Sequence, residues 1–547
     1  NPKPRPKMRM TVARVWALLF ACTLFITPHL PAAAQDAPCG VVDALDYPID
    51  IADTLELRYN DFGLLRPRFG GRHTGIDVAF NRRGDPVRAA ARGRVTYADP
   101  NGWDTEKGVV VIQHTFPDGS IIHTVYGHME QSDDIRFPVV GTCVERGDIV
   151  GVVGWPSRGL PHLHYEIRTF LPGGGGPGYV VDNPLERGWL DPLDFTDLWR
   201  IRLAPGYVSS VTFTDVPTLP PVIADDGSSI LATGSAIEAF SAQGSRLWRV
   251  TTDGVVTGIL GLPGNRVVAH TRNGQVLTLQ GGRYAAVWQV SGPDAPLVAL
   301  GETLVIVTEG GGLSAFDPMG VALWSLPGAA SIIAVSDFQT NGVQVSLAVR
   351  TAEGVRWRVV DAAGQVAYET TFRRAPLIAP VISGGWFALD GTTLYALSGS
   401  ERREIASLAP APGRTARIAA DPLGSAYIYL ADEASTLISV SASGQIRWRQ
   451  TYPVAPSTLA PLLRTDNGCL LYALDEDGAL HVFNAATGET VSNIQIYAGG
   501  IQNGSPTARL LLPQAGNRIL VSAGFLSAVV LDGAAISGGA MAQCVLG

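Results

Sequence analysis

A weak repeat runs from about residue 216 to 535 and limits the possible folds more than any other part of the chain. Each unit reads as strand, turn, strand and glycine, and most units end on an aromatic residue. The aromatic positions step by 40, 36 and 44 residues and then by 80, across a unit whose aromatic is missing. These positions are Trp248, Trp288, Trp324, Tyr368 and Trp448. A period near 40 in a sequence of short strands predicts the blades of a β-propeller.

The number of blades follows from counting the units. There are seven clear units and a partial eighth at 505–532, which a strand from 207–214 would complete. Such a closure joins the first and last strands of the ring and leaves no free edge. The sequence therefore predicts a seven- or eight-bladed propeller.

Two segments of these units carry a family resemblance. Leu394–Leu397 and Leu471–Gly478 resemble the pyrroloquinoline-quinone-type propeller repeat. The tryptophans are nevertheless predicted to pack between blades and not to stack on a quinone, since the chain has no vicinal cysteines. We expect the propeller to act as a scaffold or to bind a protein or glycan, without a cofactor.

A second feature is a cluster of histidines upstream of the repeat. Six of the nine histidines fall between residues 73 and 164: His73, His114, His123, His128, His162 and His164. Neutral imidazoles together with a carboxylate are common ligands of zinc. Residues two apart in a strand point to the same face, so His162 and His164 should project together. Asp77, four residues after His73, could approach the same ion from a loop that enters a strand.

The motifs around these histidines carry a more specific resemblance. The order His-x-x-x-Asp at 73–77, Tyr-x-His at 126–128 and Pro-His-Leu-His-Tyr-Glu at 161–166 resembles the lysostaphin-type zinc metallopeptidases, whose domain is a duplicated hybrid motif. The segments 84–95 and 144–154 resemble the family pattern as well. The resemblance implies an antiparallel β domain with His73, Asp77 and His164 as ligands of Zn²⁺ and His128 and His162 as catalytic histidines.

One stretch departs from the family pattern. The family usually has Thr-Gly-x-Ser-Thr-Gly before the paired histidines, whereas residues 154–161 read Gly-Trp-Pro-Ser-Arg-Gly-Leu-Pro. This loop should border the substrate groove, so the difference bears on substrate preference more than on chemistry. His114 is expected to have a hydrogen-bonding role, and His123 is expected to face solvent or to be structural.

Composition agrees with a chain made of β domains. Charged residues are only 16%, while the chain has 62 glycines and 37 prolines, which favours turn-rich all-β structure. The boundaries predicted from the sequence are a signal peptide at 1–34, an N-terminal extension at 35–59, the peptidase domain at 60–195, a linker at 196–215, propeller repeats at 216–535 and a C-terminal tail at 536–547.

The N-terminal segment predicts export. Residues 1–34 hold five basic residues and no acidic one, and they lead into an apolar run too short for a comfortable membrane span and then into Ala32-Ala33-Ala34. An uncleaved N-terminal anchor is the alternative. Removing the segment would shift the formal net charge from −8 to about −13, which disfavours nucleic acid or an anionic membrane as a partner. No later stretch is long and apolar enough to span a bilayer.

The four cysteines outside that segment fall in two pairs. In an oxidising compartment an even count is consistent with disulfides, although four cysteines allow three connectivities. We predict Cys39–Cys143 and Cys469–Cys544, because each pair would then lie within one domain.

Together these patterns predict a secreted or cell-envelope zinc metalloendopeptidase with a propeller as its binding or scaffold module. Peptidoglycan cross-links are the substrate that the resemblance implies; the motifs themselves indicate only metal-assisted hydrolysis. The alternative is a non-catalytic cell-envelope protein that uses both domains for protein or glycan interaction. A quinoprotein dehydrogenase is a weaker hypothesis, because it leaves the histidine cluster unexplained.

Overall fold

The chain folds into two compact units, residues 1–196 and 197–547. The computed structural model describes residues 38–49, 61–102, 107–157, 159–171, 178–212, 217–219, 221–241, 245–290, 296–329, 331–381, 384–398, 400–408, 416–431, 435–453, 460–465, 468–475, 478–496, 510–514, 518–522 and 527–537. The predicted signal peptide lies outside these residues. No helix within them is long and apolar enough to cross a membrane.

The first unit is built on antiparallel β-sheets. The main sheet has the order β13 (Trp189–Leu190), β11 (Leu163–Arg168), β7 (Ile121–Gly127), β6 (Val109–Thr115), β5 (Gly93–Asp99) and β9 (Cys143–Val144), with β3 (Ile76–Val78) also paired to β11. Two smaller sheets have the orders β1 (Leu65–Arg66), β2 (Gly71–His73), β12 (Tyr179–Val180) and β4 (Pro86–Arg88), β10 (Ile149–Val153), β8 (Met129–Glu130). Among the described residues of this unit the helices are η2 (Pro67–Phe69), η3 (Pro184–Arg187) and α3 (Pro192–Arg202), and α3 continues past residue 196, where the first unit ends in the sequence.

Strand β11 is the part of this sheet that places the site. All six of its residues are buried, and it pairs with β7 along one edge and with β3 and β13 along the other. The neighbouring strands β6 and β7 form a hairpin around a turn at residues 117–119, where Gly119 has φ 83°. This antiparallel arrangement confirms the fold expected for the domain.

The described part of the predicted N-terminal extension belongs to this unit. Within residues 38–49, the Val42 amide donates to the carbonyl of Thr115 at 2.9 Å, and the Arg88 amide donates to the carbonyl of Pro48 at 2.8 Å. Cys39 and Cys143 form a disulfide, as predicted. Cys469 is also disulfide-bonded. Its predicted partner, Cys544, lies outside the described residues, so that pairing stays a prediction.

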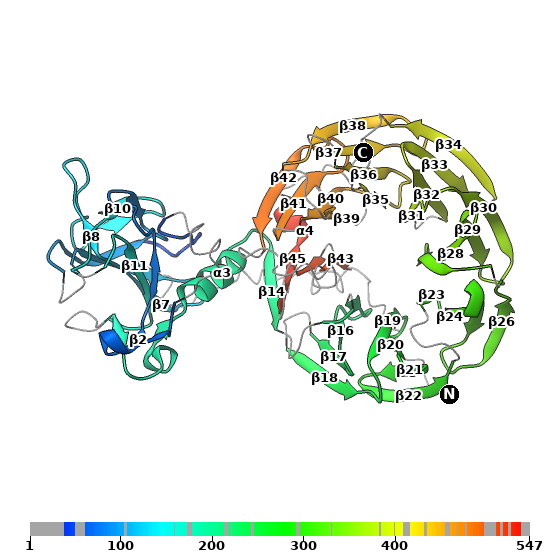
Figure 1. Ribbon diagram of the computed structural model, residues 1–547, viewed down its shortest axis with the longest axis horizontal. Helices are drawn as coiled ribbons and strands as arrows, with labels where there is room; N and C mark the ends of the chain where they lie inside the picture. The colour runs from blue at the N-terminus through cyan, green and yellow to red at the C-terminus, as the bar shows by residue number, and fades with distance from the viewer. Residues whose placement is uncertain are drawn as a thin grey trace, which may run out of the picture. The chain divides into compact units, whose positions relative to one another are not determined.

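The second unit contains eight four-stranded antiparallel sheets within the described residues, and Figure 1 shows them around a ring. Seven sheets use consecutive strands: β15–β18 (Val222–Ile223, Ser229–Thr233, Ala236–Phe240, Arg246–Thr251), β19–β22 (Val256–Leu262, Arg266–Thr271, Gln275–Gln280, Arg283–Gln289), β23–β26 (Leu297–Leu300, Thr303–Thr308, Gly312–Phe316, Ala322–Leu326), β27–β30 (Ala334–Thr340, Gln344–Thr351, Gly354–Asp361, Val366–Phe372), β31–β34 (Leu377–Val381, Gly385–Asp390, Thr393–Ser398, Glu401–Ser407), β35–β38 (Ala416–Ala420, Ala426–Leu430, Thr436–Val440, Ile446–Thr451) and β39–β42 (Leu462–Thr465, Leu470–Leu474, Ala479–Asn484, Thr490–Gln495). The short helices are η4 (Glu309–Gly311) and α4 (Gly533–Ile536).

The eighth sheet closes the ring with a strand from the other end of the repeat region. Its order is β14 (Tyr207–Thr212), β45 (Ser527–Asp532), β44 (Arg518–Ser522) and β43 (Leu510–Gln514). The segment 196–215, predicted as a linker, thus contains the second half of α3 and a propeller strand. Strand β14 is the one expected to complete the partial eighth unit, and its pairing with β45 covers an edge that would otherwise be open.

Contacts between neighbouring sheets explain the aromatic repeat. Trp324 on β26 donates its indole N–H to the carbonyl of Ala362 in the next sheet, at 2.9 Å. A Cβ on Gly364 would lie 2.7 Å from the Trp324 ring, so this turn admits only glycine. The same tryptophan–glycine pairing occurs for Trp248 with Gly282, Trp288 with Gly320 and Trp448 with Gly488. The tryptophans therefore pack between blades, as predicted.

This packing leads to a stability prediction. We expect Gly364→Ala to destabilise the propeller by about 3 kcal/mol, because the new methyl group meets Trp324 and because φ is +80° there. Gly227→Ala is the matched control: Gly227 has φ +78°, but nothing lies within 4 Å of its Cβ position, so only about 1 kcal/mol should be lost. Urea unfolding of both variants measures the difference, and equal losses would show that contact with the indole is unimportant.

Candidate metal centre

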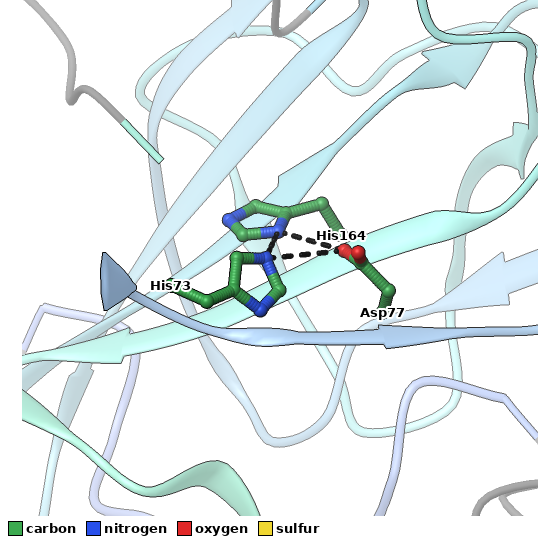
Figure 2. Close-up of side chains that lie close together, drawn as sticks. All are labelled: His73, Asp77 and His164. Carbon is green, nitrogen blue, oxygen red and sulfur yellow. Dashed lines mark hydrogen bonds and ion pairs between the residues drawn. The ribbon is translucent and has the colours of Figure 1, made fainter. Parts of the chain in front are cut away.

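Three buried side chains from three strands meet in the first unit: His73 at the end of β2, Asp77 in β3 and His164 in β11. In the pairing of β3 with β11, His164 lies directly opposite Asp77. His73 Nε2 lies 3.0 Å from His164 Nδ1, and Asp77 Oδ1 lies 3.3 Å from the first and 3.1 Å from the second. Figure 2 shows the two rings turned toward the Asp77 carboxylate. The spatial arrangement thus brings together the three residues predicted as ligands.

The opposite ring nitrogens point to carboxylates. His73 Nδ1 lies 3.0 Å from Asp61 Oδ2, and His164 Nε2 lies 2.9 Å from Glu166 Oε1. An imidazole whose far nitrogen donates to a carboxylate presents a lone pair at its other nitrogen. His73 Nε2 and His164 Nδ1 are therefore acceptors that approach each other and a carboxylate oxygen. Such a convergence of acceptors fits a cation, and two imidazoles with one carboxylate are a donor set that zinc prefers.

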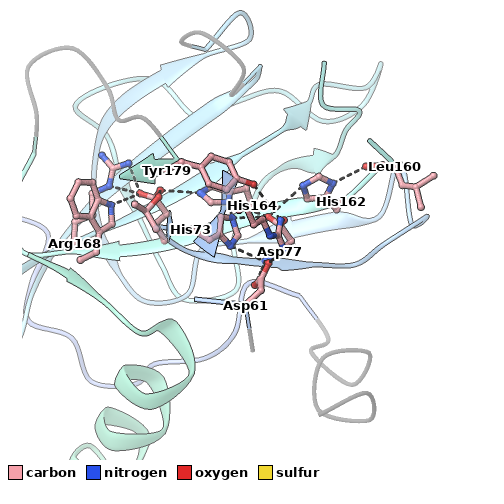
Figure 3. Close-up of polar contacts among 12 residues, drawn as sticks. Asp61, His73, Asp77, Leu160, His162, His164, Arg168 and Tyr179 are labelled. Atoms are coloured by element: carbon pink, nitrogen blue, oxygen red, sulfur yellow. Dashed lines mark hydrogen bonds and ion pairs between the residues drawn. The ribbon is translucent and has the colours of Figure 1, made fainter. Parts of the chain in front are cut away.

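The two outer carboxylates are themselves held by arginines. Figure 3 shows one of the two carboxylates, Asp61, and one of the two arginines, Arg168, among the polar contacts around the histidines. The Arg66 guanidinium contacts Asp61 Oδ2 at 2.5 Å and Asp77 Oδ2 at 3.1 Å. Glu166 forms an ion pair with buried Arg168 and accepts a hydrogen bond from the Trp189 indole at 3.1 Å. Burial raises the pKa of Glu166, but Arg168 and His164 outweigh it, so the pKa stays below its usual range. Glu166 therefore remains charged and fixes the tautomer of His164, and the close contact with Asp61 orients the His73 ring.

Charges within the group reinforce one another. Burial lowers the pKa of His73. The Asp77 carboxylate and the contact with Asp61 raise it, and together they outweigh burial, so the pKa of His73 lies above its usual value. Burial raises the pKa of Asp77, but the charge interaction with His73 and the close contacts with the histidine rings bring it well below the usual value. Positive charge is therefore favoured at the point where the three ligand atoms meet.

The two remaining predicted site residues lie beside this group. The His128 and His162 rings are 4.7 Å apart in an edge-on arrangement, and His162 Nε2 lies 3.4 Å from Asp77 Oδ1. His162 Nδ1 donates to the carbonyl of Leu160 at 2.7 Å, which leaves Nε2 as an acceptor on the site side. Burial, followed by His162, lowers the pKa of His128 to about 2, so its ring is neutral at ordinary pH.

The backbone of His128 is unusual. Its φ is 58°, in the left-handed region that non-glycine residues seldom adopt, and its carbonyl accepts a hydrogen bond from the Gly154 amide at 2.9 Å. Such conformations cost free energy and collect at functional sites. The strain thus points to a specific requirement for the direction of this side chain.

His114 and His123 lie outside the group. His114 Nδ1 donates to the Arg92 carbonyl at 2.8 Å, and Nε2 lies 2.8 Å from Thr124 Oγ1, which confirms the hydrogen-bonding role. His123 is buried, so of its two expected roles the structural one is correct.

The burial of His114 leads to a pH prediction. Burial lowers its pKa from 6.5 to about 4, against the opposing effect of the Arg92 hydrogen bond. Between pH 6.5 and 4, His114 binds a proton in the unfolded chain but not in the folded domain. The free energy of unfolding is therefore unaffected by His114 above pH 6.5 and falls as the pH drops toward 4. The loss should reach roughly 3 kcal/mol. Unfolding measured against pH should be flatter for His114→Gln, and an unchanged slope would contradict this origin.

Asp61 and Arg66 are the site residues that the sequence motifs did not reveal, because nothing near them repeats or matches a ligand spacing. Glu166 is part of the motif at 161–166, but the motif did not predict a function for it. The period of two that aligned His162 with His164 extends to Glu166 and Arg168, and this signal could have placed both of them on the same face of β11.

Fold and site together describe a β metallopeptidase-type domain joined to a propeller, and comparison with known families gives the same two classes. Residues 71–176 match peptidase family M23. Residues 233–401 match the family of the outer membrane protein assembly factor BamB, whose model describes the propeller repeat. The chain therefore fuses a domain of the M23 peptidase family to a β-propeller with BamB-like repeats. No curated protein matches the chain.

Several solved structures are similar to part of this chain. BamB from Moraxella catarrhalis is 17% identical, covers 60% of this chain and 100% of its own, and has a TM-score of 0.44. The computationally designed Ika8 protein is 14% identical, covers 60% of this chain and 99% of its own, and has a TM-score of 0.46. Sqt1 from Saccharomyces cerevisiae is 14% identical, covers 60% of this chain and 99% of its own, and has a TM-score of 0.43.

Proposed function

We propose that this chain is a secreted zinc metalloendopeptidase that hydrolyses the peptide cross-links of peptidoglycan. The observation that carries the proposal is the convergence of His73 Nε2, His164 Nδ1 and Asp77 Oδ1. The second polar atom of each side chain already contacts another group: Asp61, Glu166 and Arg66, respectively. Membership of the M23 peptidase family for this domain supports it. A zinc ion in this position supplies a Lewis acid for the scissile carbonyl and lowers the pKa of a water molecule.

The neighbouring histidines have separate tasks in this proposal. His162 keeps an acceptor nitrogen on the site side, because its other nitrogen donates to Leu160. It can therefore orient a water molecule and take its proton. His128 is neutral and close to His162, and the N–H of its neutral ring can donate a hydrogen bond that stabilises negative charge on the carbonyl oxygen.

Exposed apolar side chains flank these histidines. The Phe80 ring stacks on His162 with 5.3 Å between centroids, and Trp155 and Leu160 expose about half of their surface. Trp155 and Leu160 belong to the loop that departs from the family pattern. We infer that this loop forms an apolar wall for the substrate and sets the choice of peptide.

The propeller and the localisation complete the proposal. M23 and BamB-like domains are both typical of cell-envelope proteins, and a propeller of the second type is suited to protein interaction. We infer that the propeller holds the peptidase domain near its substrate by binding a protein or glycan of the envelope.

The test combines metal content with turnover. Purified protein should contain one equivalent of zinc and should release soluble fragments from purified peptidoglycan, whereas His162→Ala should keep the zinc and release none. Zinc without release by either protein would favour the non-catalytic binding role, and absence of zinc would contradict the assignment of the ligands.

A further inference from the structure

A cavity of about 770 Å³ lies in the propeller, between four successive sheets. Its walls come from the first strands of those sheets, β27, β31, β35 and β39, and each of these strands contacts the next. The middle of the wall is apolar and is formed by residues 375–380 of β31 and the turn before it. Charged side chains occur only toward the two ends of this row of strands among the described lining residues.

Two arginines mark one end of the cavity: Arg417 on β35 and Arg464 on β39. Solvent reaches both side chains, yet burial lowers the pKa of each, and Arg417 lowers that of Arg464 further. The Arg464 guanidinium donates to the carbonyl of Leu463 at 2.9 Å. Within the described residues neither arginine forms an ion pair with a carboxylate. Two neighbouring guanidinium groups without a counter-charge suit a bidentate anion such as a carboxylate.

A carboxyl group of this chain marks the other end. Asp337 on β27 lies two strands away from Arg417, beyond β31. Its Oδ1 accepts a hydrogen bond from the Gln339 amide at 2.8 Å, whereas its buried Oδ2 has no hydrogen-bond partner among the residues that the structure describes. Burial raises the pKa of Asp337, although Gln339 opposes the shift. A cationic group bound in the cavity would lie close to this carboxyl group and would favour its charged form.

We propose that this cavity binds a short zwitterionic peptide, with the C-terminal carboxylate at Arg417 and Arg464 and the N-terminal ammonium at Asp337. The positive and negative groups of the cavity are separated by the apolar wall of β31, as the ends of such a peptide are separated by its small side chains. A simple inorganic anion would leave both Asp337 and that wall without a contact. The inference does not depend on the peptidase activity of the other domain.

Calorimetric titration of the full chain with alanine peptides of two to five residues tests the proposal. The His162→Ala background prevents turnover. One peptide length should bind best, because the distance between the charged groups is set by the strands. Converting its carboxylate to an amide should weaken binding about tenfold or more, since the arginines lose a charged acceptor. This comparison needs no protein variant, so misfolding cannot affect it.

Variants then locate the site. Arg417→Gln and Arg464→Gln should each weaken binding of the free acid about tenfold, whereas Arg449→Gln, on the exposed face of β38 in the same sheet as Arg417, should not. Asp337→Asn should weaken binding of the free amine but not of the N-acetylated peptide. The proposal is wrong if the peptides do not bind, if acid and amide bind equally, if Arg449→Gln has the same effect, or if inorganic phosphate binds as tightly.

Discussion

Replacing His164 by alanine should remove the metal and the hydrolytic activity together. His164 Nδ1 lies 3.0 Å from His73 Nε2 and 3.1 Å from Asp77 Oδ1, so the substitution deletes one of three converging donors. We expect zinc affinity to fall by more than about 100-fold, beyond the loss caused by removing an outer hydrogen-bond partner of a ligand. Metal content after dialysis and fragment release from peptidoglycan measure both effects.

The fold should survive this change, because Glu166 keeps its ion pair with Arg168 and its hydrogen bond from Trp189. His123→Asn is the matched control, since it alters another buried histidine of the same sheet that is not part of the ligand group. The control should retain one equivalent of zinc. Full zinc occupancy in His164→Ala would remove this residue from the ligand set.

Replacing His128 should leave the metal in place and abolish turnover. The His128 ring lies 4.7 Å from the His162 ring, and His128 is not one of the three residues whose ligand atoms converge. Loss of a residue that transfers a proton or stabilises charge costs about 10² to 10⁴ in rate, so kcat should fall by that factor in His128→Ala. Zinc content and the rate of fragment release are measured on the same preparation.

The left-handed backbone of His128 requires a second variant. At φ 58° an alanine adds strain of its own, whereas asparagine adopts this region more readily. His128→Asn should therefore lose as much activity as His128→Ala while unfolding at nearly the wild-type temperature. Restored activity in the asparagine variant, or equal loss of zinc in His128→Ala and His164→Ala, would contradict the separate roles.

Much of the fold was accessible from local patterns. The period of 40 residues and the aromatic positions predicted propeller blades, and each tryptophan of the pairs described above packs on a glycine of the next sheet. The predicted closure by a strand near 207–214 is the pairing of β14 with β45. These features could be predicted because the same local unit is repeated, so that the contact of one blade with the next is repeated as well.

The outer partners of the candidate site were less accessible. Asp61 precedes His73 by twelve residues, and its contacts with His73 and Arg66 depend on how β1 and β2 fold back beside β3. The extension predicted at 35–59 is bonded to the domain within residues 38–49: its disulfide was predicted from the sequence, whereas its backbone hydrogen bonds were not. In each case a long-range contact decides the role of a residue whose surroundings in the sequence are unremarkable.

The classes of both domains were indicated by the family resemblance of their motifs, and the same resemblance implied the five residues proposed for the metal and the chemistry. Short-range geometry added that His162 and His164 project together, because residues two apart in an extended backbone share a face. The contacts of Asp61, Arg66 and Glu166 with the candidate ligands, and the shared cavity of Arg417 and Arg464, became visible only in the three-dimensional structure. Such convergence depends on pairing between strands far apart in the chain, which no local spacing records.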